Sequence, residues 1–411
     1  MTHRALILGC HGGVGSAVLA LLEQSVPGHR LRERLDTIVL ADGNPPPGPV
    51  PLKDASLLPP TTVTSAGDLS RLVREHRITE VIDLSSVDTV DCTRACDELG
   101  SDFLCTSVEE WPGQSPLATD EAIARLIPPR RPALSHRSHL VGSGANPGIV
   151  NALVFAALEA FGDRVGVPPT VEALDLHAVL ITEEDTTAAV DGVESSEVFS
   201  MTWSPLHCLE ELFEPEAFAA RKGRVAGLGH APTAEFYRAR CYSRHILGMA
   251  VPHEEIATLA RRFPSVEIAF LYRLPRSARR ALAAHPTRTT AEAWSIRRLY
   301  PPWTQALTGE DRVGVLLCSR RFGELWLGFV TDATAGAAFG TNATQLQVAA
   351  GVLAGWSQLG TRQGIHFVED LAWRAFLDVA IEVLGPPVAV YDPVALPGEL
   401  AGRSAKRQES R

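Results

Sequence analysis

The chain has 411 residues, a formal net charge of −10 and 45% hydrophobic residues, which suit two packed domains. The acidic balance argues against a nucleic-acid-binding surface. No apolar run reaches membrane-spanning length, the first residues lack a cleavable signal, and the seven cysteines are scattered. We therefore expect a cytoplasmic protein with free thiols, no metal site, and neither a membrane nor a nucleic acid as partner.

The first 42 residues carry the signals of a dinucleotide site. A short apolar strand at 4–9 runs directly into a glycine-rich turn with G-x-x-G-x-x-G spacing, and an apolar helix follows to about Leu22. Glycine permits the turn, and the helix amino terminus can face a pyrophosphate. The predicted cofactor contacts in this turn are Gly9, Gly12, Gly13, Val14 and Gly15.

Asp42 ends a second strand, predicted at 36–41. A carboxylate at that position accepts hydrogen bonds from both ribose hydroxyls and repels the 2′-phosphate of NADP. The sequence therefore favours NAD as the cofactor.

Alternating elements continue to about residue 150. Candidate strands lie at 61–64, 80–85 and 101–106, and candidate helices at 68–76 and 88–99. This alternation predicts a doubly wound parallel sheet of the Rossmann type. Ser85, at the end of one of these strands, is a further predicted cofactor contact.

The segment 142–150 (GSGANPGIV) is the most informative in the chain. It reads as the end of a buried strand, a tight turn, and a helix with Asn146 at its cap and Pro147 in its first turn. Gly144 and Gly148 permit close backbone approach, so a polar side chain is presented at the carboxyl end of a strand, where ligands bind. Ordinary strand-to-helix punctuation is the alternative reading.

Several segments, taken together, resemble bacterial homospermidine synthases and their relatives in the saccharopine dehydrogenase-like superfamily. The resemblance implies a Rossmann doubly wound parallel sheet with an inserted α+β catalytic and dimerisation domain, and a homodimer that keeps NAD bound. The matching segments, in family order, are 106–113 (TSVEEWPG), 144–150 (GANPGIV), 181–186 (ITEEDT), 202–204 (TWS), 313–317 (VGVLL), 342–348 (NATQLQV) and 385–391 (GPPVAVY).

The domain boundaries follow from this resemblance and from the pattern of elements. The βαβ alternation is lost over 170–335, and two helical stretches (342–359 and 368–384) then precede an apolar strand at Val388. We expect an NAD-binding Rossmann domain at 1–150, a catalytic and dimerisation domain at 151–340, C-terminal elements that return to the Rossmann domain at 341–397, and a polar tail at 398–411.

In the family, NAD takes a hydride from a primary amine to give an imine, a second amine exchanges onto that carbon, and the hydride returns. Such a site needs a proton relay and groups that hold cationic intermediates in a desolvated pocket. The only lysines, Lys53, Lys222 and Lys406, lie outside segments with motif character. A lysine Schiff-base mechanism is therefore disfavoured.

The resemblance assigns cation-binding roles by motif position. Trp203 would be the aromatic wall that stabilises an iminium by cation–π contact, and Glu211, Glu183 and Asp185 would bind ammonium groups. The ordinary alternatives are a core position for Trp203 and a solvated helix face for Glu210 and Glu211.

Three further roles follow from the same resemblance. Asn146, followed by Pro147, would lie beside the nicotinamide, and Glu109 near the inner amine. His253, with Glu255 nearby, would shuttle protons, although a structural histidine is the alternative.

The sequence departs from the family at 272–277 (YRLPRS). The family carries histidine and acidic residues after this apolar strand, whereas arginine, which binds carboxylates in a fork geometry, occurs here. If these arginines line the pocket, the substrate is an amino-acid-derived or opine-like secondary amine; otherwise they form a solvated helix face. They are Arg273, Arg276, Arg279 and Arg280.

Three functions therefore remain open. The leading one is a homospermidine synthase-like reaction on a small-molecule amine. The second is a saccharopine or opine dehydrogenase-like oxidation of a carboxylated secondary amine. The third is a non-catalytic NAD-binding protein.

Overall fold

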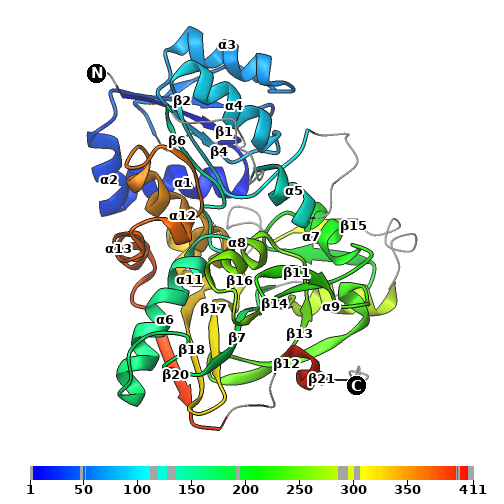
Figure 1. The fold of residues 1–411 in the computed structure, drawn as a ribbon. Coiled ribbons are helices and arrows are strands. Elements are labelled where there is room, and N and C mark those ends of the chain that lie inside the picture. Colours follow the sequence, from blue (N-terminus) through cyan, green and yellow to red (C-terminus); the bar gives the residue numbers. More distant parts are fainter. Residues whose placement is uncertain are drawn as a thin grey trace. The chain divides into compact units, whose positions relative to one another are not determined.

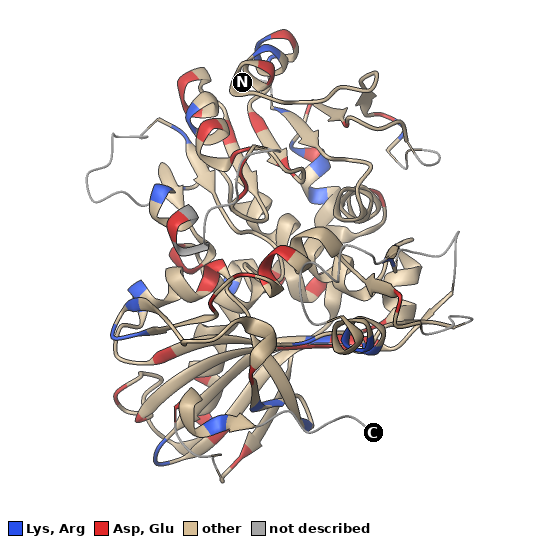
Figure 2. Ribbon diagram, turned by 90° about the vertical axis from the view of Figure 1, so that its right-hand side faces the viewer, with Lys and Arg blue, Asp and Glu red and all other residues tan. Residues whose placement is uncertain are grey.

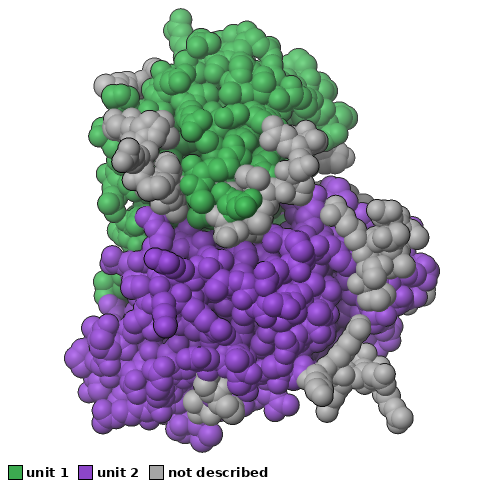
Figure 3. All heavy atoms as spheres, turned by 45° about the vertical axis from the view of Figure 1, so that its right-hand side comes forward, with its two compact units in different colours: residues 1–149, 345–385 green, residues 150–344, 386–411 purple. Residues whose placement is uncertain are grey.

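The computed structural model describes residues 3–46, 50, 52–111, 119–126, 136–190, 195–285, 295–299, 306–394, 396 and 399–405. The chain forms two compact units, coloured separately in Figure 3. Unit 1 comprises Met1–Ile149 and Gln345–Gly385, and unit 2 comprises Val150–Thr344 and Pro386–Arg411. Acidic and basic residues are interspersed along the ribbon of both units (Figure 2).

Unit 1 is built on a parallel sheet with the strand order β19-β6-β5-β4-β1-β2-β3. Its edge strand β19 comes from the C-terminal part of the chain. The strands are β1 (Arg4–Leu8), β2 (Thr37–Ala41), β3 (Ser56–Leu57), β4 (Glu80–Asp83), β5 (Asp102–Cys105), β6 (Ser138–Leu140) and β19 (Gly364–His366).

Helices flank this sheet, with α3 and α4 on one face and α1 and α12 on the other (Figure 1). Side chains cap the starts of two of these helices. Ser65 accepts a hydrogen bond from the N–H of Asp68 (3.2 Å) at the start of α3, and Asp88 accepts one from the N–H of Asp91 (2.8 Å) at the start of α4. The helices are α1 (Gly13–Gln24), α2 (Val26–Glu33), α3 (Ala66–His76), α4 (Thr89–Leu99), α5 (Thr119–Leu126), α12 (Ala343–Gln358) and α13 (Trp373–Leu384), with the 3₁₀ turn η2 (Val368–Asp370).

The predicted doubly wound parallel sheet is confirmed, with one element misplaced. Residues 61–64 are not a strand; the short strand β3 lies earlier, where Ser56 pairs with Val39 of β2. The threonines at 61–64 have high strand propensity, but a segment forms a strand only when its backbone pairs with a neighbouring strand. Thr61 donates its N–H to the carbonyl of Asp42 (2.7 Å), the residue that follows β2.

Unit 2 contains a mixed sheet with the order β20-β18-β17-β7-β14-β13-β12-β21, to which β10 and β11 are added beside β14. The pair β7–β14 is parallel, and the other pairs in this order are antiparallel. The strands are β7 (Leu176–Asp185), β10 (Phe218–Arg221), β11 (Arg224–Gly227), β12 (Phe236–Cys241), β13 (Arg244–Ala250), β14 (Glu267–Arg273), β17 (Glu310–Ser319), β18 (Gly323–Asp332), β20 (Val388–Asp392) and β21 (Ser404–Ala405).

Unit 2 also contains two small sheets, β9 (Val198–Met201) with β15 (Ser295–Arg298) and β8 (Ala188–Ala189) with β16 (Leu307–Thr308). Its helices are α6 (Ile149–Val165, which begins at the unit boundary), α7 (Pro205–Leu212), α8 (Glu254–Arg262), α9 (Arg276–Ala284) and α11 (Ala333–Ala338), with the 3₁₀ turns η1 (Pro232–Ala234) and η3 (Leu400–Arg403). In the described residues of both units, no helix is long and apolar enough to cross a membrane.

The side chains of strand β7 alternate between the two faces of the large sheet. Ala178 and Leu180 belong to an apolar core on one face, and because side chains alternate along a strand, Glu184 follows on that face. Glu183 and Asp185 therefore point to the opposite face, although all ten residues of β7 are buried.

The C-terminal residues divide differently from the expected 341–397 and 398–411 segments. Strand β20 pairs with β18 in the sheet of unit 2, so the C-terminal part of unit 1 ends at Gly385. Leu400 is buried, and Arg403 forms a buried ion pair with Glu324. The partners of this ion pair are far apart in the sequence, so the burial of Arg403 could not be predicted from the polar composition of its segment. Residues 406–411, which include Lys406, lie outside the described residues.

Candidate active site

Gly9 and Gly15 shape the turn between β1 and α1. Gly9 has a φ of 71°, and a Cβ there would lie 2.5 Å from the carbonyl oxygen of Leu84. A Cβ on Gly15 would lie 2.3 Å from the carbonyl oxygen of Gly9. Larger side chains would push the turn apart, so both glycines are required for this close approach.

The amino terminus of α1 has no side-chain cap. Gly12 is the N-cap and offers no side chain to the first-turn N–H groups, which include that of Val14. A Cβ on Gly13 would lie 2.2 Å from the side chain of Gln345, so α12 closes against this turn. A helix start of this kind can bind a pyrophosphate through backbone N–H groups and the helix dipole.

Asp42 is held rigidly beside the glycine turn. Its Oδ2 accepts the N–H of His11 (2.9 Å), and its Oδ1 accepts the N–H (2.8 Å) and the Nδ2–H (3.3 Å) of Asn44. Each carboxylate oxygen has more than one lone pair, so the group can still accept ribose hydroxyls. Asp42 thus lies beside the glycine turn with lone pairs that remain available.

Ser85 and Glu109 follow β4 and β5, whose carboxyl ends lie at the same edge of the sheet. The Asp83 carboxylate accepts the N–H (3.0 Å) and the hydroxyl (2.6 Å) of Ser85. Burial raises the pKa of Asp83 to about 7, with a smaller contribution from the charge of Glu109. Glu109 is fixed by Thr89, whose Oγ1 accepts its N–H (2.9 Å), and by the Ser107 hydroxyl (2.7 Å).

The Asn146 turn follows β6 at this same edge, but it differs from the predicted helix start. Helix α6 begins at Ile149, and the Asn146–Pro147 bond is a cis peptide. The turn closes on itself, because Gly144 N–H bonds to the Pro147 carbonyl (2.9 Å) and Ile149 N–H to the Gly144 carbonyl (2.9 Å). Asn146 is therefore in a turn, half-buried, rather than at a helix cap.

The second cluster lies in unit 2, where β7 ends in Glu183 and Asp185. Asp185 stands directly opposite Asp311 of β17, and both are buried. Asp185 accepts the Thr202 hydroxyl at Oδ2 (2.6 Å) and the Thr187 N–H at Oδ1 (2.8 Å). Burial raises the pKa of Asp185 and of Asp311, and the charge of Glu183 adds to the shift at Asp311. Neighbouring buried carboxylates resist joint ionisation, so this group suits a cation.

Aromatic rings border these carboxylates. Trp203 donates its indole N–H to the hydroxyl of Tyr272 (3.1 Å), which is buried and stands opposite Glu183 in the parallel pair. Tyr272 stacks on Phe270, with ring centroids 5.6 Å apart, and the edge of His253 meets Phe270 at 5.1 Å. Trp203 is half-buried, which leaves part of its surface for a ligand.

His253 and Glu211 influence each other's charge. His253 bonds through Nδ1 to the buried carboxylate of Glu255. Burial lowers the pKa of His253, but Glu255, Glu254 and Glu211 outweigh it and raise the value well above normal. Burial raises the pKa of Glu211, and His253 partly opposes this. The ligand atoms of His253, Glu254 and Glu255 lie within 4.8 Å of one another, a spacing that their mutual bonding already explains.

Arg273 does not share the face of Glu183 and Asp185. Its Nε lies 3.4 Å from Glu184 Oε1, and Glu184 also pairs with Arg244 (2.8 Å) and Arg312 (2.6 Å). The arginine therefore neutralises a buried carboxylate on the other face of the sheet.

The remaining predicted arginines lie on or near the exposed side of α9. Arg279 donates through Nε to the Leu274 carbonyl (3.1 Å), and Arg276 and Arg280 are exposed.

Sequence reasoning missed Tyr272, Asp311 and Thr202 as members of the carboxylate cluster. Asp311 could have been predicted from the sequence, because it directly precedes the apolar strand segment VGVLL. An acid in such a strand is costly to bury and therefore indicates a functional position. Tyr272 was noted only as the start of the arginine segment, and its place beside Glu183 depends on strand register.

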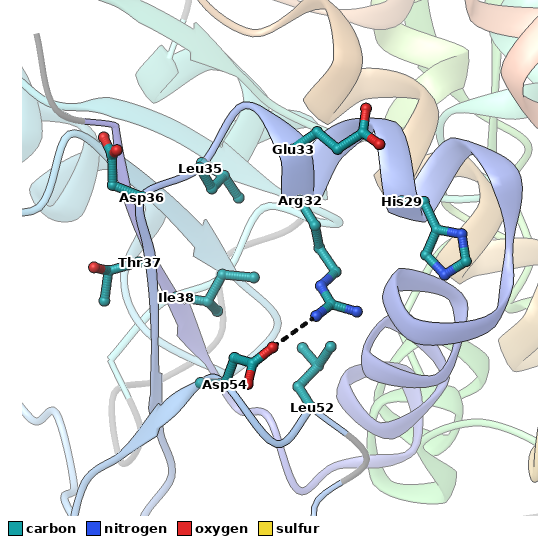
Figure 4. Close-up of a pocket in the computed structure, with 10 residues that line it drawn as sticks. His29, Arg32, Glu33, Leu35, Asp36, Thr37, Ile38, Leu52 and Asp54 are labelled. Carbon is teal, nitrogen blue, oxygen red and sulfur yellow. Dashed lines mark hydrogen bonds and ion pairs between the residues drawn. The ribbon is translucent and has the colours of Figure 1, made fainter.

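A cavity of about 390 Å³ in unit 1 lies elsewhere (Figure 4). It is lined by residues such as His29, Thr37 and Leu52, and Arg32 bonds to Asp54 (3.3 Å) across it. Thr37 begins β2, whereas Asp42 follows the end of that strand. The cavity is thus remote from the carboxyl edge that carries the glycine turn.

Comparison with known proteins finds similarity to two homospermidine synthases. No family model matches it. The homospermidine synthase of Blastochloris viridis is 28% identical over 366 residues, covering 75% of this chain and 74% of that protein. The homospermidine synthase of Mesorhizobium japonicum is 25% identical over 360 residues, covering 74% of each.

Two solved structures share the fold. Homospermidine synthase from Legionella pneumophila in complex with NAD matches with a TM-score of 0.80 and 18% identity, over 97% of this chain and 94% of that chain. Apo saccharopine dehydrogenase (L-Glu forming) from Saccharomyces cerevisiae matches with a TM-score of 0.56 and 10% identity, over 95% and 100%. The chain is thus similar in sequence to homospermidine synthases, and it shares its fold with homospermidine synthase and saccharopine dehydrogenase.

Proposed function

We propose that the protein is an NAD-dependent enzyme that makes or breaks a C–N bond through an imine, in the manner of a homospermidine synthase. The observation that carries the proposal is the buried group of Glu183, Asp185 and Asp311 beside Trp203 and Tyr272. Carboxylates and an aromatic face are the groups that hold ammonium and iminium ions away from water.

The residues of unit 1 fit NAD. Close backbone approach at Gly9 and Gly15 leaves no room for a Cβ, and the uncapped start of α1 offers N–H groups to a pyrophosphate. Asp42 suits ribose hydroxyls and opposes a 2′-phosphate. Ser85 and Asn146 are proposed as further contacts at the same edge. When bound, NAD would supply the acceptor and donor of the hydride.

The residues of unit 2 hold the amine and exchange protons with it. Glu183 and Asp185 neutralise an ammonium group, and the half-buried face of Trp203 stabilises the cationic carbon–nitrogen intermediate. His253 and Glu211 exchange protons with the amine, which must lose a proton before it can attack an imine carbon. Glu255 holds the imidazole of His253 in place.

A carboxylated substrate, as in a saccharopine or opine dehydrogenase, is the second candidate. Its specific support is the arginine segment, but Arg273 pairs with Glu184 on the other face. The acids around Asp185 would repel a substrate carboxylate. A purely NAD-binding protein would have no need for the buried carboxylates, since their desolvation is costly. We also propose a cytoplasmic homodimer, following the family resemblance.

Two measurements test the proposal. The purified protein should carry NAD or bind it, which chromatography of the denatured supernatant and calorimetry detect. Incubation with putrescine and NAD should yield homospermidine by mass spectrometry. Lack of NAD binding would rule out both enzymatic candidates, whereas NADH formation only with amino-acid-derived secondary amines would select the second.

A further inference from the structure

The ring of Trp203 is oriented by a single directional bond to Tyr272. The indole Nε1–H donates to the phenol Oη over 3.1 Å. Tyr272 is 2% exposed, lies on β14 in register with Glu183 of β7, and stacks on Phe270 with an interplanar angle of 22°. The position of the Tyr272 hydroxyl oxygen is therefore determined by a strand of the sheet and not by a loop.

The backbone before Trp203 is fixed independently. Thr202 is fully buried, and its hydroxyl donates to Asp185 (2.6 Å) and accepts from Thr344 (3.1 Å). Its carbonyl accepts the Nδ2–H of Asn342 (2.7 Å). With the backbone held, the position of the indole depends on rotation about its side-chain bonds, and the bond to Tyr272 selects one rotation.

The Tyr272 hydroxyl accepts the indole N–H and retains its own proton. An indole nitrogen only donates, so Tyr272 keeps its own proton for another acceptor. Burial, followed by the charges of Glu183 and Asp185, raises the pKa of Tyr272 well above its usual 10, so the hydroxyl stays protonated. Donation of the indole N–H to an oxygen that feels the charges of Glu183 and Asp185 makes the indole more electron-rich, which strengthens its attraction for a cation.

We infer that Tyr272 is a positioning residue, which sets the orientation of the Trp203 indole through the Nε1–H···Oη bond and thereby tunes the affinity of this cluster for a cationic amine or iminium. The inference rests on the proposed function, because that function supplies the cation.

A double-mutant cycle tests the coupling. Tyr272→Phe keeps the ring but removes Oη, and Trp203→Phe keeps an aromatic wall but removes the N–H. If Tyr272 acts through Trp203, Tyr272→Phe lowers kcat/KM for putrescine on the order of tenfold, and combining both changes costs no more than the larger single change. NAD affinity stays unchanged. Tyr237→Phe is the matched control, because its hydroxyl bonds to His230 instead, and it should leave kcat/KM within about twofold.

A second readout does not need turnover. Of the seven indole ¹H–¹⁵N signals expected from the seven tryptophans, the one that Trp203→Phe removes identifies Trp203. Tyr272→Phe should move that signal upfield, whereas Tyr237→Phe should leave it in place. An unmoved signal, or losses of kcat/KM that multiply in the double variant, would overturn the inference. If the signal moves but the wild-type protein neither binds nor converts putrescine, the hydrogen bond between Trp203 and Tyr272 is confirmed and the proposed function is wrong.

Discussion

Asp185 and Asp311 face each other across the β7–β17 pair, and each is at most 2% exposed. Ion pairs could neutralise such acids, as Arg312 neutralises Glu184 on the other face of β7. Asp185 instead accepts neutral donors from Thr202 and Thr187. Two buried carboxylates in this arrangement favour a shared proton or a bound cation, which is the physical basis of the predictions on amine binding.

Asp311→Asn should stabilise the protein at alkaline pH and weaken amine binding. A carboxyl with a raised folded pKa holds its proton more tightly when folded, so its contribution to stability falls as pH rises from about 4 toward that pKa. Asparagine does not ionise, so the variant does not lose stability in this way as the pH rises. Its unfolding free energy should therefore exceed the wild-type value by about 1 to 3 kcal/mol at pH 8. Urea unfolding from pH 5 to 8 measures this.

Calorimetry with putrescine checks the other half of that prediction, since affinity should fall at least about tenfold. Glu216→Gln, at an exposed position of unit 2, is the control for loss of one charge. A variant that is less stable at every pH would contradict a costly buried carboxylate at Asp311.

Asp83→Asn should remove a pH dependence from NAD binding. Burial raises the pKa of Asp83 to about 7, and the ionised form accepts both bonds from Ser85. NAD affinity in the wild type should therefore rise as pH increases through about 7, because ionisation strengthens the hold on Ser85. Titration calorimetry at pH 6, 7 and 8 should give a slope for the wild type and a flat profile for the variant. Parallel profiles would show that Asp83 does not act on the cofactor.

Asp42→Asn should shift the cofactor preference. The change removes the charge that opposes a 2′-phosphate and weakens the ribose bonds, so NAD affinity should fall about tenfold while NADP affinity rises. Asn44→Ala should weaken NAD binding less, because it removes the Nδ2 contact of 3.3 Å and keeps the N–H bond of 2.8 Å. Fluorescence titration with NADH and NADPH measures both. Equal loss for the two cofactors in Asp42→Asn would contradict the ribose role.

The candidate cofactor site could be predicted because its signals are local. Gly9, Gly15 and Asp42 lie within two strands and one turn, where spacing alone indicates proximity. In the carboxylate cluster of unit 2, Glu183 and Asp185 were predictable because they lie close together in one strand, β7, whereas Trp203 was predicted from the family resemblance. Tyr272 and Asp311 reach Glu183 and Asp185 through the register of β14 and β17, more than 80 residues later, and a one-residue slip would turn them to the other face. Because side chains alternate along a strand, Glu184 and Arg273 lie on the opposite face from the cluster. The sequence spacing alone did not show this for Arg273.

Trp203→Ala should lower kcat for putrescine without changing NAD affinity. A desolvated cation–π contact contributes about 2 kcal/mol, so the loss should be about thirtyfold or more. Trp373→Ala, at a half-buried position in unit 1, is a control for loss of an indole. Unchanged turnover would mean that Trp203 is only a packing residue.

Arg276→Glu separates the two substrate classes. Arg276 is exposed at the start of α9, whereas the carboxylates that hold an amine lie on β7. For a diamine substrate, reversing this charge should leave KM for putrescine within about twofold, because exposed charges are screened. For a carboxylated substrate bound by Arg276, the same change should raise KM at least about tenfold, because an arginine fork would be replaced by a repelling acid. Arg280→Glu, at a second exposed position on the same helix, serves as the matched control. Steady-state kinetics with putrescine and with amino-acid-derived secondary amines gives the comparison directly.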